Sequence, residues 1–365
     1  MAKYRVIQWG SGFTGEIALR YLITNKSLEL VGLRCYTDAK EGVDAGEVAG
    51  LPATGVAASR DVDELLSYKA DCVIFMPRDA LQDPSVPGSA SAVWVSELEQ
   101  ILRSGSNVVT PICSGTHYKH LAHGEDFRAR LQQAGEAGES TVLFTGLDPG
   151  FTDVLAFTMT SGVGNIRRID TWELLHYGGY AVSETLQAMG FGLKPEDVPV
   201  QIIDAVRRNC WGGVPYAMAD GLGVEVEKID VTGEVELAEE PFVTDAGMTV
   251  PQGTIAAMRF TVTGVVGGEP LINIHHVNRL RREDAAHWPS LGRDGGYVVE
   301  IDSFPPLRGE FALGLPGGTG AALTDGFAIT AARCVNCVGP VVQAAPGYRH
   351  FAELSVVGGR HGFRG

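Results

Sequence analysis

The sequence predicts an α/β protein of two domains, and two observations carry this prediction. Strand and helix patterns alternate from the first residues to about residue 150, which is typical of a doubly wound parallel sheet covered by helices on both faces. Long β-rich runs follow as far as about residue 325, which is typical of an α+β domain with an open, mostly antiparallel sheet. A length of 365 residues also favours two domains over one.

The first alternating unit contains a glycine-rich turn. A β-prone run over residues 4–9 ends at Trp9, and Gly10, Gly12 and Gly15 follow with the spacing G-x-G-x-x-G before a helical pattern. In a dinucleotide site the first glycine makes the tight turn, the second lets a pyrophosphate approach, and the third lets helix and strand pack closely. The helix N-terminus then attracts the phosphates. A Rossmann domain is therefore predicted, with the loop Gly10, Ser11, Gly12, Phe13, Thr14 and Gly15 binding the coenzyme.

The end of the next strand, over residues 28–36, indicates which coenzyme is bound. An NAD site usually has an acidic residue there, bonded to the ribose 2′-hydroxyl, whereas this chain has Cys35 and Tyr36. Arg34, Thr37 and Lys40, together with Tyr36, could hold a 2′-phosphate, so NADP is favoured and NAD stays open. Asp38 would reverse this preference if it faced the ribose.

The rest of the first domain continues the alternation. Helices are expected over residues 61–66, 93–102 and 127–134, and strands over 70–77, 106–111 and 140–145. Residues at the carboxyl ends of such strands border the nicotinamide half of a coenzyme. We expect Met76, Pro77 and Thr110 to lie there.

A cluster of turn residues at 146–151 marks the domain boundary, so the domains are expected at residues 1–150 and 151–325, with a C-terminal helix and tail over 326–365 returning to the first. In the second domain the patterns predict helices over 152–160, 198–206 and 216–222, strands over 166–177, 229–237, 256–266, 271–280, 297–302 and 307–313, and Gly-Gly turns at 267–268 and 295–296. A helix is expected over 326–338, ending before Pro340. A wide sheet of this kind buries a face against helices or a partner subunit, and we expect a homodimer through it.

Composition excludes several classes of function. The formal net charge of −15 argues against binding to nucleic acid or to an anionic membrane. No opening stretch resembles a signal peptide and no apolar run could span a bilayer, so a cytoplasmic protein is expected. Cys334 and Cys337 form a C-x-x-C, but no second pair stands at zinc spacing. We expect core-filling thiols and no metal site.

Four stretches of the chain together resemble a known group of enzymes. They are residues 6–12 (VIQWGSG), 44–47 with 50–52 (DAGE and GLP), 146–151 (GLDPGF) and 333–336 (RCVN). In this order they are similar to the oxidoreductases related to the N-terminal domain of dihydrodipicolinate reductase, and specifically to the branch of 2,4-diaminopentanoate dehydrogenase and NAD(P)H-dependent amine dehydrogenases.

This resemblance implies a Rossmann domain, a second α/β domain that forms the dimer, and a cleft between them. Members typically reduce an imine made from a ketone and ammonia, or run the reverse oxidation. The resemblance also implies that Asn336, on the late helix, returns to the nicotinamide side.

The chain departs from the family's pattern at two places. Amine-forming members carry a glutamate after an Asn-Val-Val like that at residues 107–109, and it binds the ammonium or iminium. Here the matching positions are Cys113 and Ser114. The His-His run, Lys and Asp-Ala-Pro-Ser-Gly stretch of dihydrodipicolinate reductase is also absent, because His275 and His276 lie elsewhere.

Hydride transfer requires a group that exchanges a proton or holds charge at the reacting atom. The candidates are His276, Tyr177 and His117, with Tyr118 beside the last, while Glu173 or Glu184 could supply the missing negative charge. We therefore expect an NAD(P)H-dependent oxidoreductase that transfers a hydride to or from a small carbonyl or imine. The alternative is a non-catalytic NADP-binding sensor of the same fold, and a third reading is a non-redox isomerase that retains its coenzyme.

Overall fold

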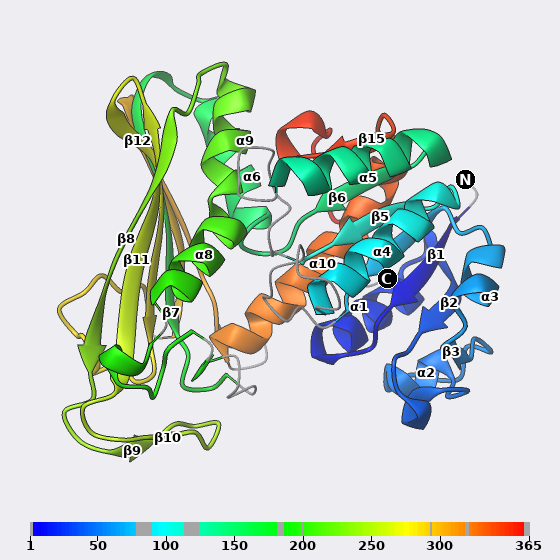
Figure 1. Ribbon diagram of the computed structural model, residues 1–365, viewed down its shortest axis with the longest axis horizontal. Coiled ribbons are helices and arrows are strands. Elements are labelled where there is room, and N and C mark those ends of the chain that lie inside the picture. Colours follow the sequence, from blue (N-terminus) through cyan, green and yellow to red (C-terminus); the bar gives the residue numbers. More distant parts are fainter. Residues whose placement is uncertain are drawn as a thin grey trace. The chain divides into compact units, whose positions relative to one another are not determined.

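The computed structural model describes residues 3–77, 90–112, 124–180, 186–187, 189–198, 200–292, 294–317 and 321–360. Its contacts divide the chain into two compact units (Figure 1). Unit 1 comprises residues 1–151 and 327–365, and unit 2 comprises residues 152–326. Among the described helices, none combines the length and the apolar character that crossing a bilayer requires.

Unit 1 is built on a seven-stranded, fully parallel sheet in the order β15-β6-β5-β4-β1-β2-β3. Its strands are β1 (Tyr4–Trp9), β2 (Leu28–Arg34), β3 (Ala58–Ser59), β4 (Cys72–Phe75), β5 (Asn107–Thr110), β6 (Thr141–Phe144) and β15 (Gly347–Arg349). Its helices are α1 (Phe13–Thr24), α2 (Ala45–Val48), α3 (Val62–Ser67), α4 (Ala90–Arg103), α5 (Gly124–Gly138) and α10 (Ala322–Val342), with short 3₁₀ turns at Asp38–Lys40 and Phe351–Glu353. The predicted doubly wound sheet is confirmed.

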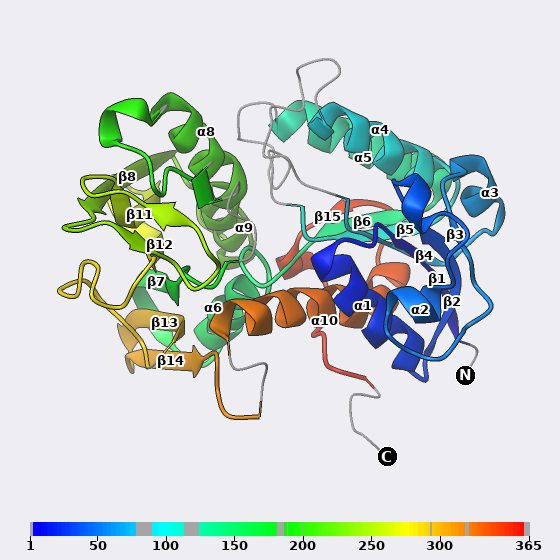
Figure 2. The ribbon, with the colours of Figure 1, turned by 90° about the horizontal axis from the view of Figure 1, so that it is seen from below.

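Helices cover both faces of this sheet, which explains why its strands are almost continuously apolar. Figure 2 shows α4 and α5 on one face and α1 and α10 on the other. Alternate residues of β4 separate accordingly, because Val73 packs with the first pair of helices and Ile74 with the second. Cys334 and Cys337 lie in the second of these cores. Burial raises the pKa of both thiols, that of Cys337 to about 11.

The C-terminal part of the chain differs from the prediction in two ways. The late helix was expected to end before Pro340, but α10 continues to Val342 and contains that proline. Apolar packing of Val338 and Val341 in the core holds this last turn, which outweighs the loss of one backbone donor. The chain then adds β15 beside β6, a strand of only three residues that no periodic pattern could signal.

Unit 2 is built on a six-stranded sheet in the order β14-β13-β7-β12-β11-β8. Every neighbouring pair is antiparallel except β7 and β12, so the prediction of a mostly antiparallel sheet is confirmed. The strands are β7 (Gly164–His176), β8 (Lys228–Leu237), β11 (Ile255–Val266), β12 (Glu269–Arg279), β13 (Gly295–Phe304) and β14 (Leu307–Ala312), and β9 (Phe242–Val243) and β10 (Thr249–Val250) form a separate pair. The helices are α6 (Phe151–Thr160), α8 (Val200–Trp211) and α9 (Gly213–Leu222), with a 3₁₀ turn at Pro195–Asp197.

The two faces of this sheet have different characters. Helices α8 and α9 lie against one face (Figure 1), where Trp211 of α8 contacts the rings of Phe260 and His276. On the other face the ring of Trp172 stacks on that of His275 with 3.8 Å between centroids. Because side chains alternate along a strand, the side chains of the adjacent residues His275 and His276 lie on opposite faces of the sheet.

The Gly-Gly pair at residues 295–296 was predicted as a turn, and this prediction was wrong. Both residues begin β13, with Gly295 at φ +110°. A Cβ on Gly295 would lie 2.1 Å from the carbonyl oxygen of Leu174, so this glycine permits a close approach of two strands. The pair at 267–268 does form the predicted turn, with φ +60° and +81°.

We predict that Gly295→Ala destabilises the protein by roughly 3 kcal/mol, because it adds a clash to a positive φ. Gly267→Ala is the matched control, since its φ is also positive but no described atom lies within 4 Å of the added Cβ. The free energy of unfolding of that variant should be lower than that of the wild type by about 1 kcal/mol. Urea unfolding measures both, and equal losses would contradict the packing argument.

Candidate active site

The glycine loop of unit 1 has the geometry that a dinucleotide requires. Gly10 has φ +98°, and a Cβ there would lie 2.3 Å from the carbonyl oxygen of Met76. A Cβ on Gly15 would lie 2.4 Å from the carbonyl oxygen of Gly10. Gly12 is different, because no described atom comes within 4 Å of the position of its Cβ. The loop is therefore tight on the protein side and open at the position where a pyrophosphate would approach.

The first turn of α1 directly follows this opening. Gly12 is its N-cap, and because glycine has no side chain it cannot cap the first backbone N–H groups. Ser11 is buried and Thr14 is half-buried, whereas Phe13 is 53% exposed and meets Phe327 of α10 edge-on at 5.2 Å. The uncapped N–H groups and the helix dipole would bind phosphate. The chain's residues fit a dinucleotide coenzyme here.

The residues expected at the end of β2 surround the same loop, but they are not equally accessible. Lys40 donates to the carbonyl oxygen of Ser11 and pairs with Glu16 at 2.9 Å. Thr37 is exposed, and Asp38 is 89% exposed in its side chain and pairs with Arg60. These groups stand at the surface, where a coenzyme phosphate could compete for them.

Arg34 differs from the expectation of an open cation. Its side chain is only 11% exposed and forms a salt bridge of 3.7 Å with Glu97 of α4. The same carboxylate accepts a hydrogen bond of 2.7 Å from the hydroxyl of Tyr36, whose ring lies over the guanidinium. Glu97 is 61 residues from Tyr36 in the sequence, so nothing near β2 signalled this partner.

The other predicted coenzyme residues lie at the carboxyl edge of the unit 1 sheet or on its last helix. Met76 is buried against Gly10, and Pro77 is half-buried beside it. Thr110 is fully buried, and its hydroxyl accepts a hydrogen bond from the backbone N–H of Ile112. The Thr110 side chain thus fixes the backbone at Ile112, directly after β5. Asn336 is half-buried on α10.

Unit 2 contains a second cluster of polar side chains, which is centred on the buried carboxylate of Glu173. One transverse row of the sheet places it, because Tyr297, Glu173, His276 and Phe260 are cross-strand neighbours on β13, β7, β12 and β11. The register of the strands therefore aligns one residue from each of four strands in a row across the sheet. Trp211 of α8 contacts the rings of His276 and Phe260, and directly opposed residues of neighbouring strands share a face, so all four side chains point to the face that α8 and α9 cover.

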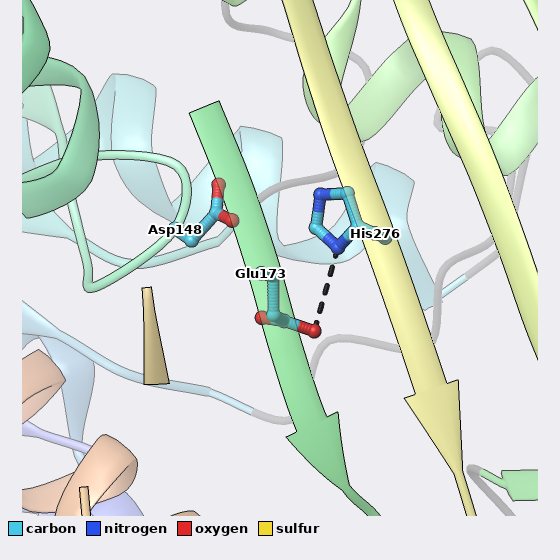
Figure 3. Close-up of side chains that lie close together, drawn as sticks. All are labelled: Asp148, Glu173 and His276. Atoms are coloured by element: carbon cyan, nitrogen blue, oxygen red, sulfur yellow. Dashed lines mark ion pairs between the residues drawn. The ribbon is translucent and has the colours of Figure 1, made fainter. Parts of the chain in front are cut away.

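Four side chains surround the Glu173 carboxylate, and we call this group the Glu173 cluster. Its Oε1 accepts hydrogen bonds from the Tyr177 hydroxyl at 2.8 Å and the Asn278 amide at 2.7 Å. Its Oε2 accepts from the Tyr297 hydroxyl at 2.6 Å. Nδ1 of His276 lies 3.4 Å from Oε1, the ion pair drawn in Figure 3. Such a concentration of donors is what an ionised carboxylate requires when it is withdrawn from water.

These contacts determine the charge of Glu173. Burial by itself raises the pKa of this carboxyl, but the neighbouring His276 and the hydrogen bonds from His276, Tyr297 and Tyr177 outweigh burial and lower the pKa below 4.5. The carboxylate is therefore ionised at neutral pH. The ring of His276 is held between this carboxylate and the ring of Phe260, which stacks on it at 4.5 Å with an interplanar angle of 4°.

The lowered pKa of Glu173 predicts a dependence of stability on pH. A carboxyl group whose pKa is lower in the folded state than in the unfolded state stabilises the folded protein at pH values above the unfolded-state pKa. This stabilisation is lost as the pH falls through the folded-state pKa. The free energy of unfolding of the wild type should therefore fall below about pH 4.5, at up to about 1.4 kcal/mol per pH unit. Urea unfolding at pH 7 and pH 3 tests this, and the difference in the free energy of unfolding between wild type and Glu173→Gln should be smaller at pH 3. A difference that stays constant contradicts the prediction.

The structure brings together two of the predicted catalytic residues, His276 and Tyr177, on one carboxylate, Glu173, which the sequence indicated only as an alternative source of charge. His117, Tyr118, Cys113, Ser114 and Glu184 lie outside the described residues. Sequence reasoning missed Tyr297 and Asn278. A signal for Asn278 existed, because it follows His276 by two residues and so shares its face of β12.

Comparisons with known proteins identify the family of this chain. The family model of the 2,4-diaminopentanoate dehydrogenase C-terminal domain matches residues 151–362. An amine dehydrogenase of Streptomyces virginiae is 29% identical over 346 residues, which cover 93% of each chain. The 2,4-diaminopentanoate dehydrogenase of Acetoanaerobium sticklandii is 20% identical over 372 residues, covering 98% of this chain and 94% of that one.

A solved structure shares the fold. The amine dehydrogenase of Mycobacterium smegmatis superposes with a TM-score of 0.76 at 18% identity, covering 98% of this chain and 97% of that one. The open glycine loop, the parallel sheet and the match over more than half of the sequence agree with one another. The chain belongs to the 2,4-diaminopentanoate dehydrogenase family, and it is an oxidoreductase that uses a nicotinamide coenzyme.

Proposed function

We propose that the protein interconverts a small amine and the corresponding ketone through an imine, and that the Glu173 cluster receives the substrate's nitrogen. The observation that carries this proposal is the buried, ionised Glu173 carboxylate beside His276. A fixed negative charge in a site of low polarity stabilises a cationic ammonium or iminium. The relatives named amine dehydrogenase and 2,4-diaminopentanoate dehydrogenase support the same substrate class.

The reaction has a simple balance of atoms. Oxidation of a protonated amine removes a hydride from carbon and a proton from nitrogen, which leaves an iminium. Water then converts the iminium to a ketone and ammonium, and the reductive direction reverses both steps. The nicotinamide coenzyme, when bound by the glycine loop, accepts or supplies the hydride.

The residues of the Glu173 cluster have distinct parts in this proposal. His276 exchanges the proton with the substrate nitrogen, as a histidine does in general acid–base catalysis. Glu173 holds His276 through Nδ1 and balances the positive charge of the substrate. Tyr177 and Tyr297 fix the carboxylate through their hydroxyl groups. Tyr177 and Tyr297 are therefore positioning residues.

The test is a coupled pair of measurements on the whole protein. Binding of NADPH and NADH is followed by nicotinamide fluorescence, and turnover is then followed with a panel of small ketones with and without ammonium. Ammonium-dependent consumption of the coenzyme supports the proposal. Ammonium-independent reduction of the ketones would replace it with a carbonyl reductase, and binding with no consumption in either direction would favour the sensor.

We propose NADP as the preferred coenzyme. The last residues of β2 are Leu33 and Arg34, so no acidic residue at the end of this strand could bind a ribose 2′-hydroxyl. Asp38, which follows the strand, is paired with Arg60. Lys40 places a cation beside the loop, where it donates to the carbonyl oxygen of Ser11 and pairs with Glu16 at the surface. The ratio of kcat/KM for NADPH to that for NADH checks the proposal, and a ratio below one would contradict it.

We also propose a homodimer that forms through the six-stranded sheet. The face opposite α8 and α9 carries cross-strand pairs of both charges, such as Arg259 with Glu234 and Arg308 with Glu300, which could pair with a second copy. It also carries a hollow of about 290 Å³ lined in part by Trp172, Thr261 and His275. Light scattering measures the mass, and Trp172→Glu should shift a dimer to monomer; a monomeric wild type would refute the proposal.

A further inference from the structure

The buried salt bridge between Arg34 and Glu97 lies outside the Glu173 cluster and outside the glycine loop. Each carboxylate oxygen of Glu97 has its own partners. Oε1 lies 3.7 Å from Nη2 of Arg34, and Oε2 accepts hydrogen bonds from the Tyr36 hydroxyl at 2.7 Å and the Trp9 indole N–H at 3.2 Å. One acidic residue of α4 thus organises the residues that end β1 and β2.

Arg34 lies at the position that binds the 2′-hydroxyl or 2′-phosphate of a coenzyme in dinucleotide-binding domains. In a dinucleotide-binding domain an acidic residue at the end of the second strand binds the ribose 2′-hydroxyl, and an arginine nearby accommodates a 2′-phosphate. Arg34 is the last residue of β2 and Tyr36 follows two residues later. The backbone N–H of Gly10 bonds to the carbonyl oxygen of Arg34 at 3.1 Å, so this strand end directly adjoins the glycine loop.

The guanidinium is not fully satisfied by its protein neighbours. Nη1 donates to the carbonyl oxygen of Cys35, and the Tyr36 ring centroid lies 4.7 Å from Cζ. The Nε donor is buried, and among the residues that the structure describes it has no hydrogen-bond acceptor. A buried donor without an acceptor is costly, and an anionic ligand beside it would be favoured.

Three of the ion pairs near this end of the sheet differ in how easily a ligand can compete with them. Lys40–Glu16 and Arg60–Asp38 are exposed pairs, which water and salt screen. Arg34–Glu97 has side chains only 11% and 12% exposed, so the negative charge of Glu97 is screened least. Glu97 therefore has the largest effect on the local potential of the three acids.

We propose that Glu97 is a specificity-determining residue, which lowers the selectivity for a 2′-phosphorylated coenzyme by neutralising Arg34. The proposal rests on the coenzyme site proposed above. It predicts that removing the charge of Glu97, with Tyr36 still held by a neutral acceptor, increases the affinity for NADP⁺ and leaves the affinity for NAD⁺ almost unchanged.

The test compares Glu97→Gln with the wild type by calorimetric titration with NADP⁺, NAD⁺ and the fragment 2′,5′-ADP. The ratio of NADP⁺ to NAD⁺ affinity should rise on the order of tenfold, and 2′,5′-ADP should bind more tightly by a similar factor. These measurements need no substrate. They can therefore fail while amine turnover succeeds, or succeed while it fails.

The chain offers a matched control on the same helix. Glu99 forms hydrogen bonds of 3.0 and 2.6 Å with Arg130, so Glu99→Gln breaks a carboxylate–arginine pair and changes the net charge equally. It should leave both affinities unchanged. A rise in NADP⁺ affinity in Glu99→Gln equal to that in Glu97→Gln would show a general charge effect and overturn the proposal.

A double variant separates the charge effect from a rearrangement of Tyr36. Arg34→Gln in the Glu97→Gln background should abolish the gain in NADP⁺ affinity, since the gain depends on the guanidinium. If Glu97→Gln does not fold, Glu97→Asp withdraws the carboxylate by one methylene and should give a smaller shift in the same direction. An unchanged ratio, or equal changes for NADP⁺ and NAD⁺, would overturn the proposal.

Discussion

Gly12→Val is expected to weaken binding of both NADPH and NADH by about 100-fold or more, which corresponds to about 2.7 kcal/mol. The reason is the empty space at this residue, because no described atom lies within 4 Å of its Cβ position and the backbone conformation is not left-handed. The protein therefore has room for a Cβ at this residue. The added methyl groups then occupy the space through which a pyrophosphate would reach the backbone.

The measurement combines fluorescence titration with urea unfolding. The free energy of unfolding should stay within about 1 kcal/mol of the wild type. Gly164→Val is the control, because Gly164 at the start of β7 is also unstrained and also has no described atom within 4 Å of its Cβ position. That variant should bind both coenzymes normally. Retention of coenzyme affinity in Gly12→Val would show that the dinucleotide does not bind at this loop.

Glu173→Gln is expected to lower kcat for amine oxidation by about 100-fold or more. Glutamine has nearly the same shape and can still meet Tyr177 and Tyr297, so the loss isolates the negative charge. Coenzyme affinity should change by less than about twofold, because the residues bonded to the Glu173 carboxylate include none of the glycine loop. Steady-state kinetics and fluorescence titration give the two quantities.

Asp170→Asn provides the matched control for this prediction. Asp170 lies three residues earlier on β7 and is also a buried carboxylate, but it accepts hydrogen bonds from Arg168, Asn273 and the ring of His275 on the opposite face. Loss of the Asp170 charge should alter the free energy of unfolding or the oligomeric state. It should have little effect on kcat, expressed per mole of folded protein. If both variants lost activity equally, or if Glu173→Gln kept full kcat, the proposed part of Glu173 would be refuted.

Local sequence was sufficient to predict the position and shape of the glycine loop. The close approach of Gly15 to Gly10 and the open position of Gly12 lie within one strand–turn–helix unit, so spacing along the chain specifies them, whereas Gly10 also needs the approach of Met76 after β4. The existence of most strands was predictable for the same reason, since periodicity is a local property. Their ends were less predictable. The Gly295 backbone was taken for a turn because its close neighbour, Leu174, is remote in sequence.

The environment of each polar group could be determined only from the folded structure. Arg34 looks like an open cation when only β2 is considered, and its acidic partner comes from α4. Glu173 looks like one polar residue in a strand, yet it meets Asn278 105 residues away and Tyr297 124 residues away. Charge, protonation and orientation depend on such neighbours, and no pattern near either residue carries that information.

The sequence by itself determined that the chain begins with a parallel α/β unit and a glycine-rich turn between its first strand and helix, because hydrophobic periodicity and glycine spacing act over a few residues. Only the tertiary structure decided which side chains share a site. Strand register in unit 2 aligns Tyr297, Glu173 and His276 across β13, β7 and β12. Packing of α4 in unit 1 brings Glu97 to Arg34. Both depend on contacts between distant segments, whose energies arise only when the chain is folded.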